Sequence, residues 1–560
     1  MTELARQIPD SESLPARIKR RAAVPSLRAL LVLWLPAGVA AAAVLLPVAY
    51  LVLRASQAGA EVWALVLRPS TLQTLGRTVL LALSVTVAST GLALPLAWLT
   101  TRTDLPGRRL WSVLTALPLV IPSYVGAYLL VSTLGPRGML QGWLETWLGV
   151  TRLPEIYGFP GALYILTILS YPFILLSVRA ALQRMDPAQE EAARSLGLSA
   201  WRTFWRVVLP QLRPAITAGA MLVALYVVRD FGAVAIMRYN TFTRVIYLQY
   251  TSTFDRTAAA VLALVLVALT LALLAIETWT RGRAAYYSSS AAHPRPPVLL
   301  PLGRWRWPAL LFCSLVVLAG VVMPAVNLGY WLWRGVAAGE QVGALWLETR
   351  NSIWAAALAA VATLVAALPA AAVSVRYRNR ASWLIERLAY AAFALPGIVI
   401  ALALVFFGSN YVRPLYQTLP LLTLAYVILF LPEAVGAIRT SLLQVHPSME
   451  EAARGLGHSP WAVFRRITLP LVRPGVASGA ALVFLTTMKE LPATLLLAPI
   501  GFKTLAIGVW GAVSEAFFAR AAAPALLIIL VSSVPMAVLL LRDRGPGQHD
   551  SAPSSPPRLQ

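Results

Sequence analysis

The sequence has few charged residues and almost no cysteine. Asp, Glu, Lys and Arg make up 12% of its 560 residues, about half the share in a soluble domain, whereas 58% are hydrophobic. The single cysteine, Cys313, excludes a secreted scaffold held by disulfides. A mean hydropathy of +0.71 excludes a soluble enzyme and a disordered chain. The composition therefore predicts an integral membrane protein.

Lysine and histidine are also scarce, and their positions exclude further classes. A nucleotide-binding P-loop needs a Gly-Lys-Ser/Thr run, but the three lysines follow Ile, Met and Phe. The four histidines lie in segments predicted to be cytoplasmic, which excludes axial ligands of an intramembrane haem and a histidine-based metal site within the spans. We therefore predict no catalytic residues, no cofactor and no resident metal ion.

Twelve apolar runs are long enough to cross a bilayer as helices, since about 20 residues span its core. They lie at 29–53, 78–100, 112–134, 160–182, 215–238, 257–279, 308–333, 352–375, 388–409, 415–438, 475–498 and 521–541. With the N-terminus inside, the inner loops and both termini hold 32 basic residues and the outer loops 13, which predicts cytoplasmic termini. This bias explains the net charge of +24 without nucleic-acid binding.

The spans divide an all-α polytopic chain into two fused six-helix halves. A polar, basic, Pro/Ser-rich stretch between spans six and seven is typical of a linker. The predicted segments are a cytoplasmic N-terminal segment (1–28), a first half (29–280), a cytoplasmic linker (281–306), a second half (307–541) and a disordered cytoplasmic tail (542–560).

The two halves repeat the same sequence. Pro187–Pro214 and Pro447–Pro474 align without a gap at an offset of 260, with 16 of 28 positions identical. Upstream, pairing Pro118 with Pro396 gives an offset of 278, so the first half is expected to carry about 18 extra residues within 135–159. Six spans per half give both copies the same orientation, which predicts a two-fold axis along the membrane normal and a pathway between the halves.

Each repeated loop is expected to fold into a helix–glycine–helix elbow between two spans. Asp186 can cap the first helix and Gly197 can end it in a left-handed conformation, although His446 replaces Asp186 in the second copy. The second short helix is expected to end at Pro210 or Pro470. The alternative is a pair of amphipathic helices at the membrane interface, but two copies in register favour docking to a partner with matching two-fold symmetry.

The same loops carry the pattern Glu-Ala-Ala, three residues, Gly, nine residues, Ile or Val, one residue, Leu-Pro. This pattern resembles that of the permease subunits of bacterial ATP-binding-cassette (ABC) importers. The resemblance implies the type I importer permease fold, the bacterial inner membrane, two cytoplasmic ATPase subunits and a solute-binding protein on the outer face. The ATPase-coupling residues that it implies are Glu190, Glu191, Ala192, Ala193 and Gly197, and Glu450, Glu451, Ala452, Ala453 and Gly457.

A fused pair of halves resembles the importers of iron(III) and of thiamine. The run from Met488, MKELPATLLLAPIGFKTLA, is similar to the iron(III) permease group, whereas the first half departs with Arg229-Asp230-Phe231-Gly232. The resemblance therefore implies transport of iron(III). Thiamine, polyamines or oxyanions remain alternative cargoes, and a secondary transporter can also have two six-helix halves.

Two acid–base pairs, Arg229-Asp230 and Lys489-Glu490, lie inside predicted spans. Ionisable groups at this depth are costly and usually face the bundle interior or water. These four residues are therefore candidates for lining the pathway, with Asp230 and Glu490 available to a cation. The alternative is that each acid neutralises a nearby base and stabilises the interface between the halves, and the sequence leaves both open.

Overall fold

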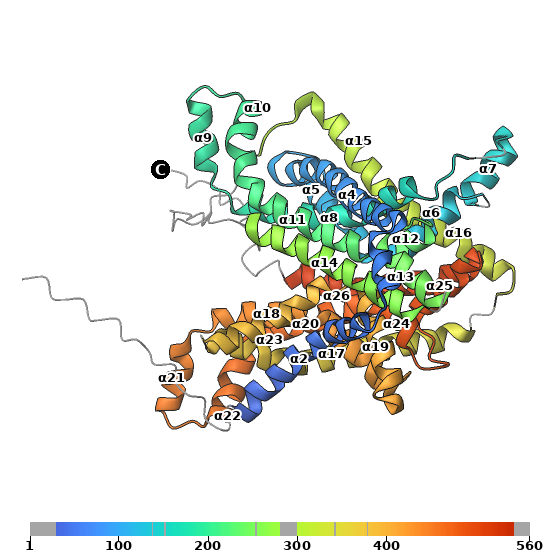
Figure 1. Cartoon of the computed structure of the whole chain (residues 1–560). Helices are drawn as coiled ribbons and strands as arrows, with labels where there is room; N and C mark the ends of the chain where they lie inside the picture. Colours follow the sequence, from blue (N-terminus) through green and yellow to red (C-terminus); the bar gives the residue numbers. More distant parts are fainter. Residues whose placement is uncertain are drawn as a thin grey trace, which may run out of the picture.

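The structure is a computed structural model that describes residues 30–136, 138–150, 153–252, 255–280, 299–340, 343–377 and 379–542. The predicted N-terminal segment, most of the linker and nearly all of the tail lie outside these residues. The described part is built of helices (Figure 1), and it includes ten that are long and apolar enough to cross a membrane. Two bent helix pairs also pass this test of length and composition if each is one span, which gives the twelve predicted spans.

The long helices follow the predicted order in both halves. In the first half they are α2 (Leu35–Ser56), α4 (Pro69–Arg102), α8 (Phe159–Arg184), α11 (Leu209–Arg229) and α14 (Arg256–Thr280). In the second they are α15 (Arg306–Val317) continuing into α16 (Met323–Ala337), α17 (Gly343–Arg376), α20 (Leu419–Gln444), α23 (Leu469–Lys489) and α26 (Phe518–Arg542).

Spans three and nine are bent rather than straight. The second-half pair, α18 (Arg380–Ala391) and α19 (Gly397–Asn410), meets at 105°, and Pro396 precedes α19. The first-half pair, α5 (Arg108–Leu114) and α6 (Ser123–Leu134), bends in the same way at Pro122. Proline favours an extended conformation in the residue before it and lacks an amide hydrogen, so a helix readily breaks there.

This geometry corrects the predicted pairing of prolines between the halves. Pro122, not Pro118, occupies the position of Pro396, so the offset here is 274. It falls to 260 at the next helix, where α8 begins at Phe159 and α20 at Leu419. The first half therefore carries 14 extra residues rather than 18, and they include α7 (Met139–Leu148).

Spans five and eleven are shorter than predicted. They were expected to run on to 238 and 498, but α11 ends at Arg229 and α23 ends at Lys489. Separate short helices, α12 (Gly232–Ile236) and α24 (Pro492–Leu497), follow each break. The acid–base pairs thus lie at helix breaks rather than within continuous helices.

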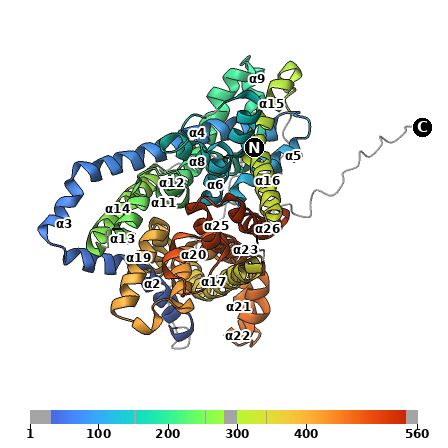
Figure 2. The ribbon, with the colours of Figure 1, turned by 90° about the vertical axis from the view of Figure 1, so that its right-hand side faces the viewer.

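The first helix of each half packs on the other half. α2 lies against α17, α18 and α19 (Figures 1 and 2), and α16 contacts both α6 and α26. Where the first helix of the second half meets the first half, a Cβ added to Gly320 would lie 2.8 Å from Cγ of Pro118, so the two segments are in close contact. Tyr128, which is fully buried, donates a hydrogen bond across the interface to the carbonyl of Phe518 at 2.8 Å. The halves are therefore interlocked and share one hydrophobic core.

Candidate functional site

The first elbow (residues 186–203) folds as predicted. α9 (Pro187–Ser195) begins after Asp186, whose carboxylate accepts a hydrogen bond from the amide of Ala188 at 3.0 Å. The helix ends before Gly197, whose φ of +83° is disfavoured for any residue with a Cβ. The chain then turns back into α10 (Ala200–Thr203).

The second elbow (residues 446–463) has the same form despite its different cap. Nδ1 of His446 accepts a hydrogen bond from the amide of Ser448 at 3.3 Å, so histidine takes over the capping role of Asp186 at the start of α21 (Pro447–Gly455). Gly457 has a φ of +84°. α22 (Pro460–Val463) follows, capped by the hydroxyl of Ser459. Figure 1 shows α9 and α21 projecting at the same end of the molecule.

The second helix of each elbow does not end at Pro210 or Pro470, contrary to the prediction. It passes through a π-helical turn, Phe204–Val208 or Phe464–Thr468, directly into the following span. The wider hydrogen-bond spacing of this turn accommodates the missing amide hydrogen of the proline. Each elbow is therefore continuous with the helix that ends at Arg229 or Lys489.

The candidate coupling residues divide between two faces of the elbow helix. Glu191 and Ala192 are exposed, as are Glu451 and Ala452. Ala193 and Ala453 are buried against the protein, and so are most atoms of the preceding acids. Since helix residues three or four apart share a face, only part of the Glu-Glu-Ala-Ala run can meet a partner.

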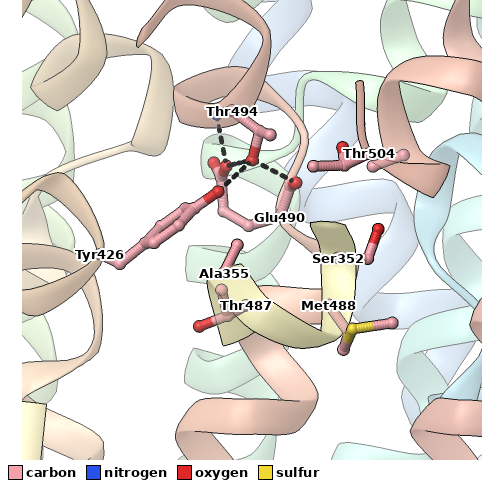
Figure 3. Close-up of a pocket in the computed structure, with 9 residues that line it drawn as sticks. Ser352, Ala355, Tyr426, Thr487, Met488, Glu490, Thr494 and Thr504 are labelled. Atoms are coloured by element: carbon pink, nitrogen blue, oxygen red, sulfur yellow. Dashed lines mark hydrogen bonds between the residues drawn. The ribbon is translucent and has the colours of Figure 1, made fainter. Parts of the chain in front are cut away.

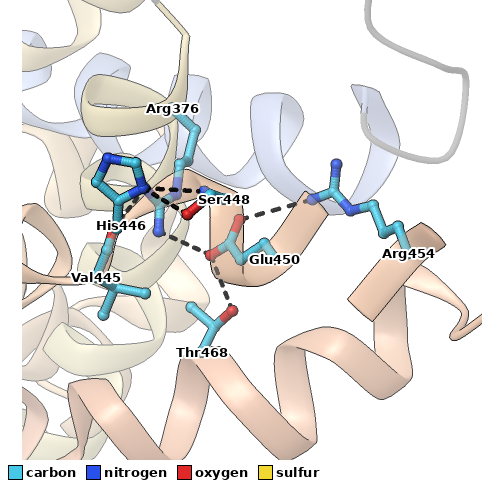
Figure 4. Close-up of polar contacts among 7 residues, drawn as sticks. All are labelled: Arg376, Val445, His446, Ser448, Glu450, Arg454 and Thr468. Carbon is cyan, nitrogen blue, oxygen red and sulfur yellow. Dashed lines mark hydrogen bonds and ion pairs between the residues drawn. The ribbon is translucent and has the colours of Figure 1, made fainter. Parts of the chain in front are cut away.

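Glu190 and Glu450 hold the elbows to the membrane helices instead of facing outward. Glu190 pairs with Arg102 at the end of α4 (3.2 Å), and Glu450 pairs with Arg376 at the end of α17 (2.7 Å). Figure 4 shows that Glu450 also accepts a hydrogen bond from Thr468 (2.9 Å) and lies 3.6 Å from Arg454. We refer to these two ion pairs as the elbow anchors.

Sequence reasoning missed both the anchor arginines and an apolar part of the exposed surface. Leu196 and Leu456 at the elbow tips are 84% and 81% exposed, and Trp201 and Trp461 on the second short helix of each elbow are 69% and 66% exposed. Large apolar side chains that are exposed in a group are typical of protein contacts. The sequence repeat could have revealed these residues. Leu196 matches Leu456 and Trp201 matches Trp461 at the offset of 260, and Arg102 matches Arg376 at the offset of 274.

The two intramembrane acids cap the short helices that follow them. Asp230 accepts hydrogen bonds from the amides of Ala233 at 2.9 Å and Val234 at 3.4 Å. Glu490 accepts from the amides of Ala493 (2.9 Å) and Thr494 (3.0 Å), as Figure 3 shows for Thr494. The carboxylate oxygens therefore accept hydrogen bonds from the first amides of α12 and α24, and the N-terminus of a helix stabilises negative charge.

The two bases reach across the boundary between the halves. Lys489 of the second half donates a hydrogen bond to the carbonyl of Leu119 in the first half at 3.1 Å. Arg229 of the first half lies close enough to Glu433 and Glu490 of the second half for their charges to interact. Glu433, which has no acidic counterpart in the first half, also accepts a hydrogen bond from Thr486 at 3.1 Å. Lys489 therefore makes a contact between the halves, and the pathway role of the four charged residues stays a prediction.

A small cavity of about 10 Å³ lies beside Glu490, bordered by the hydroxyls of Tyr426, Thr487 and Ser352 (Figure 3). This is about the space of one water molecule. Within the described ranges, no three His, Cys, Asp or Glu side chains are grouped so that they could hold a metal ion.

Comparison with known proteins gives the family. The family described as "Binding-protein-dependent transport system inner membrane component" matches this chain twice, at residues 89–284 and 362–545. The Fe(3+)-transport system permease protein FbpB 2 of Haemophilus influenzae is 37% identical over 88% of this chain and 95% of its own length. The molybdenum transport system permease protein ModB of Escherichia coli is 32% identical over 29% of this chain and 72% of its own length.

The chain therefore belongs to the family of inner-membrane components of binding-protein-dependent transport systems, with the permease domain present twice. It is a multi-pass membrane protein of the ABC importer class. Permeases of this class are translocation subunits that work with ATPase and solute-binding partners.

Proposed function

We propose that this chain is the membrane permease of an ATP-driven importer of iron(III). The cargo is supported by the relative named for Fe(3+) transport, which aligns with nearly the whole chain at 37% identity. The coupling mechanism is supported above all by the duplicated elbow, which presents the same acidic, small and apolar side chains twice at one end of the molecule. Two ATPase subunits would dock there, one on each elbow.

The proposed orientation follows from the elbows and the basic residues. The elbows and both termini would lie in the cytoplasm, with the six-helix halves at 29–280 and 307–541. The loaded binding protein would meet the opposite end, where Figure 1 places α7.

The proposed transport cycle uses the elbow anchors and the continuous elbow helices. Closure of the ATPase pair on ATP would move both elbows, and the anchors would pass this motion to α4 and α17. α11 and α23 would move as well, since each is continuous with its elbow. Arg229 and Lys489 would then shift against the opposite half, and the acids Asp230 and Glu490 would keep the helix breaks intact. The cavity would switch from inward-open to outward-open.

The first experiment measures ATP hydrolysis by the reconstituted permease–ATPase complex. The solute-binding protein is added empty, loaded with iron(III) or loaded with thiamine. We expect stimulation by the iron-loaded form alone. Stimulation by thiamine alone would keep the mechanism and replace the cargo. If the permease binds no ATPase subunit, the coupling role of the elbows is wrong and a secondary transporter becomes the better explanation.

A second experiment tests the exposed acids directly. Changing Glu191 and Glu451 together to lysine should reduce binding of the ATPase subunits without preventing membrane insertion, because it reverses two charges on the docking face. The matched control changes the exposed Glu61 and Glu145, which lie outside the elbows, in the same way. Equal ATPase binding by the elbow variant and the control would contradict the proposal.

Gly457→Pro tests the shape of the elbow rather than its charge. The amide of Gly457 donates to the carbonyl of Arg454 at 3.0 Å, and proline can neither donate this bond nor adopt a φ of +84°. We expect an inserted permease whose ATP hydrolysis no longer responds to the loaded binding protein. Normal transport by this variant would contradict a coupling role for the second elbow.

A further inference from the structure

The chain just before α15 is fixed to the first half by one isolated β-bridge, and we call the extended residues 299–302 around it the linker strand. The amide of Leu300 donates to the carbonyl of Arg102 at 2.9 Å, and the amide of Asp104 donates to the carbonyl of Leu300 at 3.2 Å. This pairs Leu300 with Thr103 in a parallel bridge. The side chain of Asp104 adds a bond from the amide of Leu302 at 2.8 Å. The strand therefore lies directly beside Arg102, the arginine of the first elbow anchor.

Contact with this strand accompanies deep burial of the first anchor. Thr103 and Leu105 are 1% and 2% exposed, and the side chain of Arg102 is 3% exposed. At the corresponding place in the second half, Tyr377 and Asn379 are half-buried and the side chain of Arg376 is 19% exposed. The second anchor has the same ion pair but lacks an equivalent cover among the residues that the structure describes.

A groove lies where the second cover would bind. It has a volume of about 530 Å³ and is lined by residues on both sides of Arg376 along the chain, on α17, on α18, and at Tyr377 and Asn379 between the two helices. They include Ser374, Tyr377, Asn379, Arg380, Trp383 and Glu386. Tyr377 and the half-exposed Trp383 add aromatic surface to a lining that is otherwise polar or charged, which suits an extended segment of mixed polar and apolar side chains.

The sequence offers a segment that matches the first strand. Residues 300–304 read Leu-Pro-Leu-Gly-Arg and precede the first helix of the second half, whereas residues 24–28 read Val-Pro-Ser-Leu-Arg and precede the first helix of the first half. The described chain begins at Leu30, and the ring of Trp34 lies 5.4 Å from that of Tyr377. The six residues back to Val24 can reach about 20 Å when extended, so the groove is within range.

We propose that this groove binds residues 24–28 of the same chain. Val24 would lie beside Tyr377 as Leu300 lies beside Thr103, with its amide donating to the carbonyl of Arg376. The bound segment would cover Arg376 and position it for the ion pair with Glu450. Each elbow anchor would then be held by the chain that enters the first helix of the opposite half.

Disulfide cross-linking in the full permease–ATPase complex tests the pairing. In a Cys313→Ala background, the pair Val24→Cys/Tyr377→Cys is compared with Thr103→Cys/Leu300→Cys, the pair that the structure shows bridged. We expect both to cross-link at rates within about threefold of each other, since Cα atoms of bridged residues lie within disulfide range. A register control, Leu27→Cys/Tyr377→Cys, should stay reduced, and linked peptides are identified by mass spectrometry.

Cross-linking of the control pair without that of Val24→Cys/Tyr377→Cys would overturn the proposal. A second measurement covers the case in which the paired variants insert poorly. Labelling of Asn379→Cys by a membrane-impermeant maleimide should rise severalfold when Val24→Pro removes the bonding amide, but not with Val24→Ala. Protection of Asn379→Cys only when ATPase subunits are added, or only in vesicles of anionic lipid, would assign the groove to those partners instead. None of these readouts depends on iron, so they can fail independently of the proposed transport function.

Discussion

The two elbows have the same backbone but are held in place by different means. In the first half, Arg102 is almost fully buried, contacts Glu190 and is flanked by the linker strand at Leu300. In the second half, Arg376 is more exposed, and Glu450 gains further contacts from Thr468. Val208 stands where Thr468 does, so this extra hydrogen bond is specific to the second half. The two elbow helices are thus held by different sets of contacts.

The helix breaks within the membrane show a second difference between the halves. Asp230 lies near the hydroxyl of Ser123, whereas Glu490 lies opposite Gly397, where an added Cβ would be 3.0 Å from its Oε1. Ser123 and Gly397 are equivalent positions, each the first residue of its helix after the bend. The additional methylene of glutamate in the second half is thus matched by the missing side chain of glycine at the facing position.

The largest expected effect comes from breaking each anchor in turn. Arg102→Met leaves the largely covered Glu190 without its ion-pair partner, at a cost of about 3 kcal/mol, the lower end of the range for breaking a buried pair. Arg376→Met should cost less, because Thr468 and Arg454 still contact Glu450. Thermal unfolding of the purified variants and binding of ATPase subunits measure the difference. A double variant, Arg102→Met with Glu190→Leu, should recover much of the loss, and equal losses for the two single variants would contradict unequal support.

A moderate effect is expected from exchanging the matched residues at the helix breaks. Gly397→Ser should crowd Glu490 and destabilise the protein by about 1–3 kcal/mol. Adding Glu490→Asp should restore stability, because the second half would then carry the same pair as the first. The single and double variants are compared by their midpoints of thermal unfolding in detergent. If the double variant is no more stable than Gly397→Ser alone, the two positions are not matched in the way proposed.

Replacing the elbow glycines is expected to have a smaller effect on stability, and the effect should be the same in the two elbows. Gly197→Ala and Gly457→Ala each place a Cβ in a left-handed conformation, which costs about 1 kcal/mol. Hydrogen exchange of the amides in α9 and α21 should speed up by a similar factor in the two variants. Unequal factors would show that the elbows differ in backbone as well as in support.

The smallest effect is expected from exchanging the caps of the elbow helices. His446→Asp should stabilise α21 and Asp186→His should destabilise α9, each by about 0.5 kcal/mol, because aspartate is the stronger N-cap. Exchange rates at the amides of Ala188 and Ser448, which donate to the caps, report the change. Faster exchange in His446→Asp would mean that histidine contributes something other than a cap.

Much of the fold and of the candidate site followed from local pattern. The caps at Asp186 and Ser459 and the left-handed glycines Gly197 and Gly457 depend on a few adjacent residues, so the elbows were predictable. The continuation past Pro210 was not, because a π-helical turn upstream absorbs the effect of the proline. The breaks after Arg229 and Lys489 were also missed, since an apolar run continues beyond them.

The sequence by itself determined the membrane class, the twelve apolar runs, the repeat and the two elbows, because hydropathy, spacing and capping are properties of neighbouring residues. Only the tertiary structure decided which acids face outward, which arginines anchor the elbows, and that the first helix of each half lies on the other half. These features join residues separated by many tens of positions. Their energies depend on burial and distance, which arise only when the two halves pack together.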